Sequence, residues 1–222
     1  MRVRLDRHVA HVAEWIAQQG ELLSPDYRQA ERFLQALDPR AGGFWYRTFS
    51  DSPYTRQAGM DPLERAIHGT LSSCWEELSF LNRQGAAIGV TINRSNGKGR
   101  EVSNIQRVRA LFMDDDNAST DPDRFFLQPQ IQVCTSLGHY HHYWLVRDLP
   151  VVHFSRLQDR LARRYGGDNK VLALNQSMQL PGFWRRKSLG RSRLPSIYRV
   201  TAREPYRLAE LEELLVAGPV LR

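Results

Sequence analysis

Cysteine is scarce in this sequence of 222 residues, and long apolar runs are absent. Its two cysteines, Cys74 and Cys134, lie too far apart for a zinc-binding pattern and are too few for a disulfide framework. No apolar run approaches the roughly 18 residues of a membrane span, and the N-terminal residues lack the apolar core of a signal peptide. We therefore expect a cytoplasmic protein in a reducing compartment, with no membrane partner.

The sequence also lacks internal repeats, low-complexity segments and a Gly-x-x-x-x-Gly-Lys-Ser/Thr motif, so it contains no P-loop motor. What it does contain suits a folded domain, since 41% of its residues are hydrophobic and 10% are aromatic. Its 31 Lys and Arg residues exceed its 24 Asp and Glu residues, for a formal net charge of +7. This excess of positive charge favours a polyanionic partner.

Three consecutive aspartates follow a short apolar run. Residues 110–113 are typical of a strand buried on both faces, and Asp114, Asp115 and Asp116 come directly after them. Alternate residues of a strand share a face, so Asp114 and Asp116 point one way and Asp115 the other. Neighbouring carboxylates repel each other unless a cation or a proton lies between them, and hard divalent cations prefer such oxygen ligands. The pattern indicates a metal site, with an acidic turn facing water as the alternative.

Hydrophobic periodicity predicts an α+β chain. We expect helices over 6–19, from Ser24-Pro25 to about 37, and over 72–82, 152–165, 170–176 and 208–217, with a short helix near 63–67 inside a long loop over 51–69. Strands are expected over 44–49, 86–93, 110–113, 131–136, 139–146 and 197–201. This order resembles a ferredoxin-like, RNA-recognition-type (RRM) palm with an antiparallel-leaning sheet. Residues 1–69 would form a mostly helical N-terminal part, 70–203 the core and 204–222 a C-terminal helix.

Two further stretches carry charges in patterns suited to binding. The loop over 94–100 combines two glycines with Lys98 and two arginines. It could wrap phosphates or be a flexible hairpin with solvated charges. The run over 185–193 has five cationic residues in nine, a composition that engages phosphates or extends into solvent.

Three motifs occur in order along the chain. They are an apolar strand that ends in Asp114-x-Asp116, a Ser136-x-Gly-x-x-His141 strand with a trailing Tyr-Trp, and Gly-Gly-Asp168 followed by Leu180-Pro-Gly and Lys187. Together they resemble the archaeo-eukaryotic primase (AEP) superfamily, specifically its RepB-like branch of plasmid and phage primases and primase-polymerases. The resemblance covers residues 70–190 and extends only loosely over the N-terminal third.

The resemblance implies a nucleotidyltransferase with the AEP primase fold. Such enzymes make primers on single-stranded DNA by template-directed transfer of NTP or dNTP units, here for replication of a plasmid, phage or other mobile element. Two Mg²⁺ or Mn²⁺ ions hold the reacting oxygens in this chemistry. The chain would be a stand-alone primase or the catalytic core of a larger replication protein, and a replicative helicase is a partner that this role allows.

The functional positions of the family can be carried over to this chain. The metal ligands, and so the catalytic residues, would be Asp114, Asp116 and Asp168, although the sequence alone favours Asp168 as the cap of the helix expected after it. The residues expected to bind the nucleotide are Ser136, His141, Lys187, Arg109 and Asn93. Those expected to bind DNA are Lys98, Arg100, Arg185 and Arg186. The aromatic candidates for stacking on bases, or for packing in the core, are Trp144, Trp184 and Phe183.

This chain departs from the family pattern at two positions. Gln176 and Gln179 stand before the Leu-Pro-Gly motif, where the family usually has arginines. Glutamine donates hydrogen bonds but carries no charge, so we expect a weaker affinity for triphosphate unless Arg185 and Lys187 supply the charge.

Two other functions are compatible with the sequence. His139-x-His141 on a strand, followed by a helix with Tyr165, resembles HUH-type rolling-circle nicking endonucleases, in which the histidines bind a metal and the tyrosine bonds covalently to a DNA phosphate. This alternative leaves Asp114 and Asp116 without a role. The second alternative is a basic module of a replication initiator that binds single-stranded DNA without catalysis, which the two glutamines allow.

Overall fold

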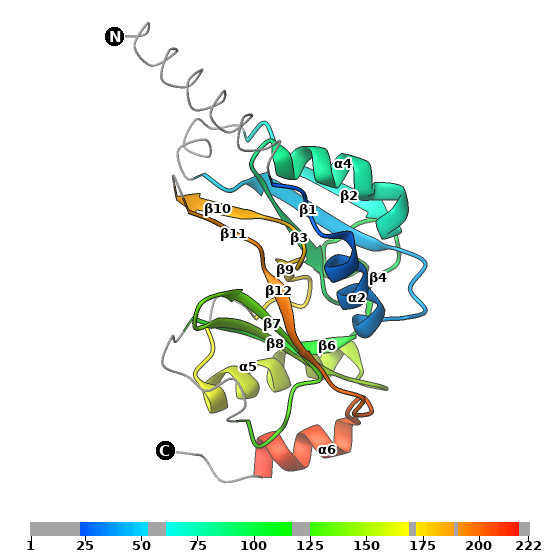
Figure 1. Ribbon diagram of the computed structural model, residues 1–222. Coiled ribbons are helices and arrows are strands. Elements are labelled where there is room, and N and C mark those ends of the chain that lie inside the picture. Colours follow the sequence, from blue (N-terminus) through cyan, green and yellow to red (C-terminus); the bar gives the residue numbers. More distant parts are fainter. Residues whose placement is uncertain (1–22, 53–60, 117–124, 169–171, 189–190, 218–222) are drawn as a thin grey trace, which may run out of the picture.

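Figure 1 shows two four-stranded sheets, one above the other, in the computed structural model. The structure describes residues 23–52, 61–116, 125–168, 172–188 and 191–217. The first sheet has the strand order β2-β1-β3-β9 and the second the order β12-β7-β8-β6, and all their pairs are antiparallel. The predicted α+β class with antiparallel sheets is thus confirmed. Within the described part of the chain, no helix combines the length and the hydropathy of a membrane span.

The strands of the first sheet come from both halves of the chain: β1 (Phe44–Ser50), β2 (Arg65–Gly69), β3 (Ala86–Thr91) and β9 (Ser177–Gln179). The second sheet is made of β6 (Ala110–Asp115), β7 (Ile131–Ser136), β8 (His139–Leu145) and β12 (Ser196–Val200). Two small ribbons pair β4 (Arg94–Ser95) with β5 (Ile105–Arg107), and β10 (Arg185–Ser188) with β11 (Arg191–Arg193). The helices are α2 (Tyr27–Leu37), α4 (Leu71–Arg83), α5 (Phe154–Tyr165) and α6 (Leu208–Glu212), with 3-10 turns at Val102–Asn104 and Val151–His153 and a π-helical turn at Glu213–Ala217.

Alternation along β1 gives the first sheet one packed face and one open face. The even-numbered residues of β1 are buried, and helix α4 packs against β1 and β3 on that side. The odd-numbered residues, Trp45, Arg47 and Phe49, are only half-buried on the other face. Because side chains of a strand alternate between faces, Trp45, Arg47 and Phe49 lie on the side away from α4, whereas the aromatic residues Phe44 and Tyr46 are buried on the α4 side.

The second sheet is covered by α5, which packs against its edge strand β6 (Figure 1). The apolar stripe of α5 is fully buried at Phe154, Leu157 and Leu161. Gln158 is buried in the same stripe, where its side-chain amide donates to the carbonyl of Phe112 and accepts from the Phe112 N–H (3.1 Å). Since an edge strand has backbone groups with no neighbouring strand, Gln158 takes the place of that strand.

Three local predictions are wrong. Residues 65–69 form strand β2 in place of a helix or loop, because they pair with β1. Helix α2 begins after Asp26 and not after Ser24, because the Asp26 carboxylate accepts a hydrogen bond from the Gln29 N–H (3.2 Å). Residues 172–176 form turns where the helix over 170–176 was predicted.

The remaining predicted elements fare better. The helix expected over 6–19 lies outside the described residues, as do residues 169–171. The other predicted helices and strands are confirmed within a few residues at their ends. The basic run over 185–193 forms the β10–β11 hairpin and does not extend freely into solvent. Residues 44–50 and 65–69, from the predicted N-terminal part, share a sheet with β3 of the predicted core.

A buried ion pair joins the end of α2 to the start of β6. The Asp38 carboxylate accepts hydrogen bonds from Arg109 Nε (2.7 Å) and Arg107 Nη2 (2.8 Å), and the side chains of Asp38 and Arg109 are 4% and 3% exposed. The guanidinium of Arg109 also lies over the ring of Phe44, 4.5 Å from its centroid. Burial by itself would raise the pKa of Asp38, but the hydrogen bond and charge of Arg109, together with Arg107, hold it below its ordinary value.

Asp38→Asn is expected to lower the free energy of unfolding at pH 7 by about 3–5 kcal/mol, because it leaves the buried charge of Arg109 unpaired. The pKa of Asp38 is lower in the folded state, so its contribution is present above the unfolded pKa of about 4 and is lost as the pH falls through the folded value. The difference between the two proteins should therefore shrink below about pH 4. Urea unfolding at pH 7 and at pH 3 measures both values.

Glu64→Gln is the matched control, since Glu64 pairs with Arg47 at the surface (3.3 Å) and should contribute less than about 1 kcal/mol. Equal stabilities for the Asp38 variant and the unmodified protein at pH 7 would show that the pair contributes nothing.

Candidate active site

Two carboxylates and two imidazoles face each other at the end of β6. Asp114 and Asp116 share one face, and the antiparallel register with β8 sets Asp114 directly opposite His141. His141 Nε2 lies 3.4 Å from Asp114 Oδ1, and His139 Nδ1 lies 3.0 Å from Asp116 Oδ1. The side chains of Asp114 and Asp116 are 24% and 68% exposed, so both carboxylates can be reached from solvent.

Asp115 points to the opposite face of the sheet, as the alternation predicts. It is buried, and its Oδ2 atom lies 3.4 Å from Nε2 of His142, which is also fully buried. The other ring nitrogen of His142 lies 3.2 Å from the side-chain amide of Gln132, and the ring of Phe125 packs against the imidazole. The Asp115–His142 pair anchors the end of β6 on its buried face, so the strand that carries Asp114 and Asp116 is held in place.

Asp168 reaches the same place through two glycines. Helix α5 ends at Gly166, whose φ of 73° is left-handed. A Cβ atom on Gly167 would lie 2.3 Å from Cγ of Met113, so only glycine lets the chain pass this close to β6. The N–H of Asp168 then donates to the Asp114 carbonyl (3.1 Å). The two glycines therefore bring the backbone of Asp168 against that of Asp114.

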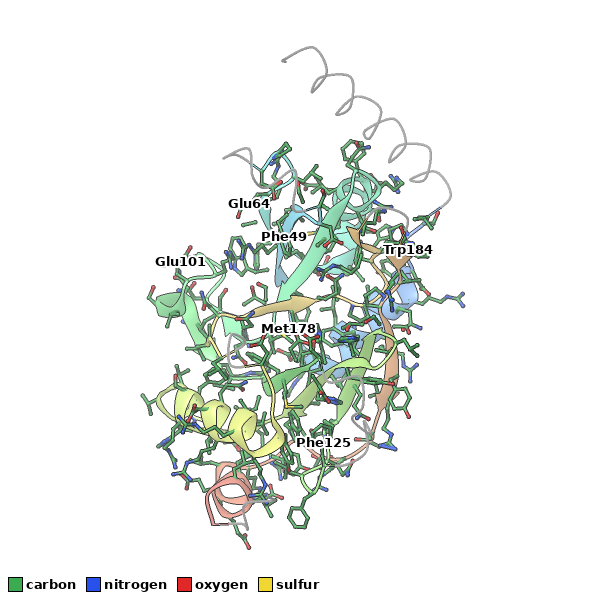
Figure 2. All side chains as sticks on the ribbon, turned by 90° about the vertical axis from the view of Figure 1, so that its left-hand side faces the viewer. Phe49, Glu64, Glu101, Phe125, Met178 and Trp184 are labelled. Atoms are coloured by element: carbon green, nitrogen blue, oxygen red, sulfur yellow. The ribbon has the colours of Figure 1, made fainter. Side chains whose placement is uncertain are left out.

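A cavity of about 440 Å³ opens beside Asp114 and His141, between the two sheets. Its lining combines this acidic end with three arginines and with polar residues of β9 and the turn before it. The residues that line it are Arg47, Phe49, Gly89, Arg100, Asp114, His141, Asn175, Gln176, Ser177, Met178, Gln179 and Arg185. Figure 2 labels Phe49 and Met178, which border the cavity from β1 and from β9.

Small residues on β3 make room for this cavity. Gly89 pairs with Arg47 of β1 on one side and with Gln179 of β9 on the other, so it lies on the face of the sheet that carries Arg47. Its neighbours on that face of β3 are Ala87 and Thr91, which are also short. On this face the side chains of β3 are therefore shorter than those of the neighbouring strands β1 and β9, which leaves space above β3.

The predicted DNA-binding residues divide between the cavity and other contacts. Arg185 lines the cavity, where its guanidinium binds both oxygens of Asp51 (3.1 Å each) and donates to Gln179 Oε1 (2.8 Å). Arg100 also lines the cavity, whereas Lys98 is exposed in the preceding loop. Arg186 turns away and donates to backbone carbonyls at the end of α4.

The loop over 94–104 is ordered by its own side chains. Asn96 Nδ2 donates to Asn104 Oδ1 (3.1 Å), Asn104 Nδ2 donates to Glu101 (2.8 Å), and the Lys98 N–H donates to Asn96 Oδ1 (2.9 Å). These Asx-type hydrogen bonds stabilise the turn. The loop does connect the antiparallel strands β4 and β5, and Lys98 within it is exposed, as the hairpin alternative predicted.

The predicted nucleotide-binding residues also divide. Ser136 is half-buried at the mouth of the β7–β8 hairpin, and Lys187 lies on β10. Asn93 and Arg109 are buried and do not line the cavity. Asn93 Oδ1 accepts from the Arg109 N–H, and Asn93 Nδ2 donates to the Leu174 carbonyl, each at 2.9 Å. Their contacts join β3, β6 and the turn before β9, so we do not include them among the proposed nucleotide ligands.

The geometry argues against the nicking alternative. Tyr165 is 7% exposed, its ring stacks on Trp144, and its hydroxyl accepts a hydrogen bond from the Leu127 N–H (3.1 Å). Trp144 lies on the face of β8 opposite to His139 and His141. The tyrosine is therefore in the core, on the far side of the sheet from the two histidines, and cannot attack a phosphate there.

The stacking candidates of the sequence are mainly structural. Trp144 and Phe183 are fully buried, and Trp184 donates to the Ser24 carbonyl (3.0 Å). The sequence missed Arg47 and Phe49 as cavity residues. Their alternation with the buried residues of β1 is the signal that could have found them.

The described residues contain no ready-made cluster of three His, Cys, Asp or Glu side chains arranged to hold a metal ion. The donor chemistry still fits a hard divalent cation. Asp114 and Asp116 offer carboxylate oxygens on one accessible face. Asp168, whose backbone N–H donates to the Asp114 carbonyl, is the candidate for a third carboxylate ligand. The side chains nearest to the carboxylates of Asp116 and Asp114 are the imidazoles of His139 and His141.

Comparison with solved structures shows the class of fold. The AEP domain of the primase-polymerase of cyanophage S-2L is similar with a TM-score of 0.68 and 20% identity, covering 87% of this chain and 100% of that one. The primase RepB′ is similar with a TM-score of 0.58 and 16% identity, covering 86% of this chain and 61% of that one. Its catalytic domain in complex with initiator DNA has a TM-score of 0.59 at 16% identity, covering 86% and 92%. The fold is therefore that of an AEP primase domain.

The sequence comparison is more specific than the fold. The chain belongs to the family of RepB DNA-primase N-terminal domains, whose model matches residues 90–214, more than half of its length. The comparison with curated proteins found no match. The predicted RepB-like primase family is thus confirmed, and the matched residues include both the aspartates of β6 and the histidines of β8.

Mn²⁺ at about 100 times its dissociation constant is expected to raise the free energy of unfolding by about 2.7 kcal/mol, because the ion binds the folded protein only. The double variant Asp114→Asn with Asp116→Asn should show no such increase, since it keeps the shape of the side chains but removes their charge. Thermal unfolding with and without the ion measures the effect. An equal increase in both proteins would place the metal elsewhere.

Proposed function

We propose that this domain is the catalytic unit of a DNA primase, a nucleotidyltransferase that makes primers on single-stranded DNA for a plasmid, phage or other mobile element. The observation that carries the proposal is the cavity in which Asp114 and His141 meet three arginines. Carboxylates for cations beside cationic groups for phosphates are what nucleotide triphosphate transfer requires. The similar catalytic domain in complex with initiator DNA supports a DNA partner for this chain as well.

In this proposal Asp114, Asp116 and Asp168 hold Mg²⁺ or Mn²⁺. Once bound, the ions would supply Lewis-acid stabilisation of the triphosphate and of the attacking 3′-hydroxyl. The chain itself keeps the carboxylates on one face of β6, and the Asp115–His142 pair holds that strand in place from the other face. The carboxylates of Asp114 and Asp116 would then exchange their contacts with the imidazoles for contacts with the ions.

His141 then becomes available to the nucleotide. Its Nε2 atom, now 3.4 Å from Asp114, would donate to a phosphate oxygen, while Nδ1 faces the hydroxyl of Tyr143 at 3.4 Å. Arg185 and Arg100 add charged donors from the other side of the cavity. Ser136 and Lys187 remain proposed ligands of the same triphosphate.

Gln179 has a definite role in this arrangement. It stands where the family usually has an arginine, and its side-chain oxygen accepts a hydrogen bond from Arg185. Asp51 holds the same guanidinium from the opposite side. In this proposal Arg185 supplies the positive charge that Gln179 lacks.

Asp114→Ala with Asp116→Ala is expected to reduce nucleotide incorporation on a primer-free single-stranded DNA circle by about 10³-fold or more, because the metal-borne charge stabilisation is lost. Labelled oligomers made in Mg²⁺ or Mn²⁺ are the readout, and separate reactions with NTPs and dNTPs report the preferred sugar. Asp159→Ala, at a surface pair with Arg163 on α5, is the matched control and should keep full activity.

Synthesis that persists in the double variant would refute the metal assignment. No product from the unmodified protein, together with salt-sensitive binding to single-stranded DNA, would instead support the non-catalytic module.

Arg185→Ala is expected to raise the KM for the nucleotide by about tenfold or more with a smaller change in kcat, because charged hydrogen bonds to the bound triphosphate are lost. Steady-state incorporation at varied nucleotide concentration measures both constants. Arg163→Ala removes an arginine that is 76% exposed on α5 and should leave both unchanged. An unchanged KM in the Arg185 variant would exclude this residue from the triphosphate site.

A further inference from the structure

The open face of β1 carries a row of aromatic and cationic side chains, of which the proposed function includes only Arg47, as one of the three arginines of the cavity. Trp45, Arg47 and Phe49 all lie on this face, away from the helices. The ring of His68, on the paired residue of β2, lies 4.9 Å from that of Trp45 at an angle of 35°. We call these four residues the β1 strip.

The β1 strip runs directly into the cavity. Phe49 and Arg47 line the cavity itself, and Trp45 continues the same face of the strand beyond them. The ordered loop over 94–104 borders the other end, because a Cβ atom on Gly97 would come within 3.7 Å of the His68 ring. Arg100 of this loop also lines the cavity, so a second cationic side chain besides Arg47 is present where the strip meets the cavity.

Two side chains of the β1 strip have hydrogen-bond donors without a partner among the described residues. The Nε atom of Arg47 and the Nε1 atom of Trp45 are buried and have no hydrogen-bond partner among the described residues. The Nη2 atom of Arg47 pairs with Glu64 at 3.3 Å, with the two side chains 41% and 54% exposed. An exposed pair of this kind contributes little to stability, so a phosphate group can replace the carboxylate at small cost. The Arg47 guanidinium also lies 5.6 Å from the centroid of the Phe49 ring.

We infer that the β1 strip binds the single-stranded DNA template where it enters the cavity, with bases stacked on Phe49 and Trp45 and a phosphate on Arg47. This inference rests on the proposed primase function. Single-strand binding sites combine aromatic faces with a cationic groove in this way, because every base has a face to stack and every nucleotide a charge. The net charge of +7 of the chain and the continuity with the cavity favour a nucleic acid over a protein partner at this face.

Fluorescence anisotropy of a labelled oligothymidylate, without nucleotide or metal ion, tests the inference apart from catalysis. Phe49→Leu keeps an apolar side chain but removes the aromatic face, and we expect it to weaken binding about fivefold or more. Phe49→Trp keeps the face and should bind at least as tightly as the unmodified protein. Phe80→Ala is the matched control, since Phe80 is an exposed aromatic on α4, which covers the other face of the sheet, and it should not change the affinity.

Salt dependence separates stacking from charge. Arg47→Ala should make the slope of log K against log salt shallower by about 0.7, the value for one phosphate on a single strand. Phe49→Leu and Trp45→Leu should weaken binding at every salt concentration while leaving the slope unchanged. An oligomer with abasic positions in place of bases should bind the unmodified protein and Phe49→Leu with similar affinity, because it has nothing to stack.

The outcomes distinguish this inference from the proposed function. If Phe49→Leu, Trp45→Leu and Arg47→Ala bind the oligothymidylate like the unmodified protein, the β1 strip is not the template site, and primer synthesis by the same protein would still stand. The Asp114→Ala with Asp116→Ala variant should bind the oligomer no more weakly than the unmodified protein, because the strip does not include the aspartates. Weakened binding by Phe49→Leu in a protein that makes no primers would support the strip and refute the primase.

Discussion

The mutual repulsion of the carboxylates at the end of β6 is the constraint around which this domain is arranged. Asp114 and Asp116 share a face because a strand alternates, and the register of β6 on β8 sets imidazoles beside them. Asp115 would add a third charge to the cluster, but it is turned to the opposite face and buried against His142. Two faces of one sheet thus divide three negative charges, so that the accessible face keeps a pair and the buried face a single carboxylate with its own partner.

Side-chain size explains the rest of the site. The central strand β3 presents large residues to the core under α4, and Gly89 with its short neighbours to the other side. The cavity is therefore a consequence of what β3 lacks. In the second sheet, helix α5 packs against β6, and its Gln158 hydrogen-bonds to the backbone of Phe112. The two glycines that follow α5 then lead the chain back to Asp114. Core packing and site geometry come from the same alternation of residues.

The sequence predicted the parts of the site that lie on one short hairpin or its neighbouring strand. Asp114, Asp116 and His141 come together because β6 and β8 are adjacent antiparallel strands. The prediction of β2 as a helix failed because residues 65–69 become a strand only through pairing with β1, which no local pattern reports. Asn93 and Arg109 were predicted as nucleotide ligands because they match positions in the family that the sequence resembles. A sequence does not show that two polar groups satisfy each other in the interior, as these do.

The hydrogen bonds between Arg185 and Asp51 join residues 134 positions apart in the chain. Bringing such distant groups together costs chain entropy that only a nearly complete fold can offset. It follows that the position of Arg185 in the cavity depends on contact between distant parts of the chain. A chain in which β10 has not reached Asp51 would still have its motifs but would lack the charge of Arg185 in the cavity, so the affinity of the cavity for an anion reports whether these parts have come together.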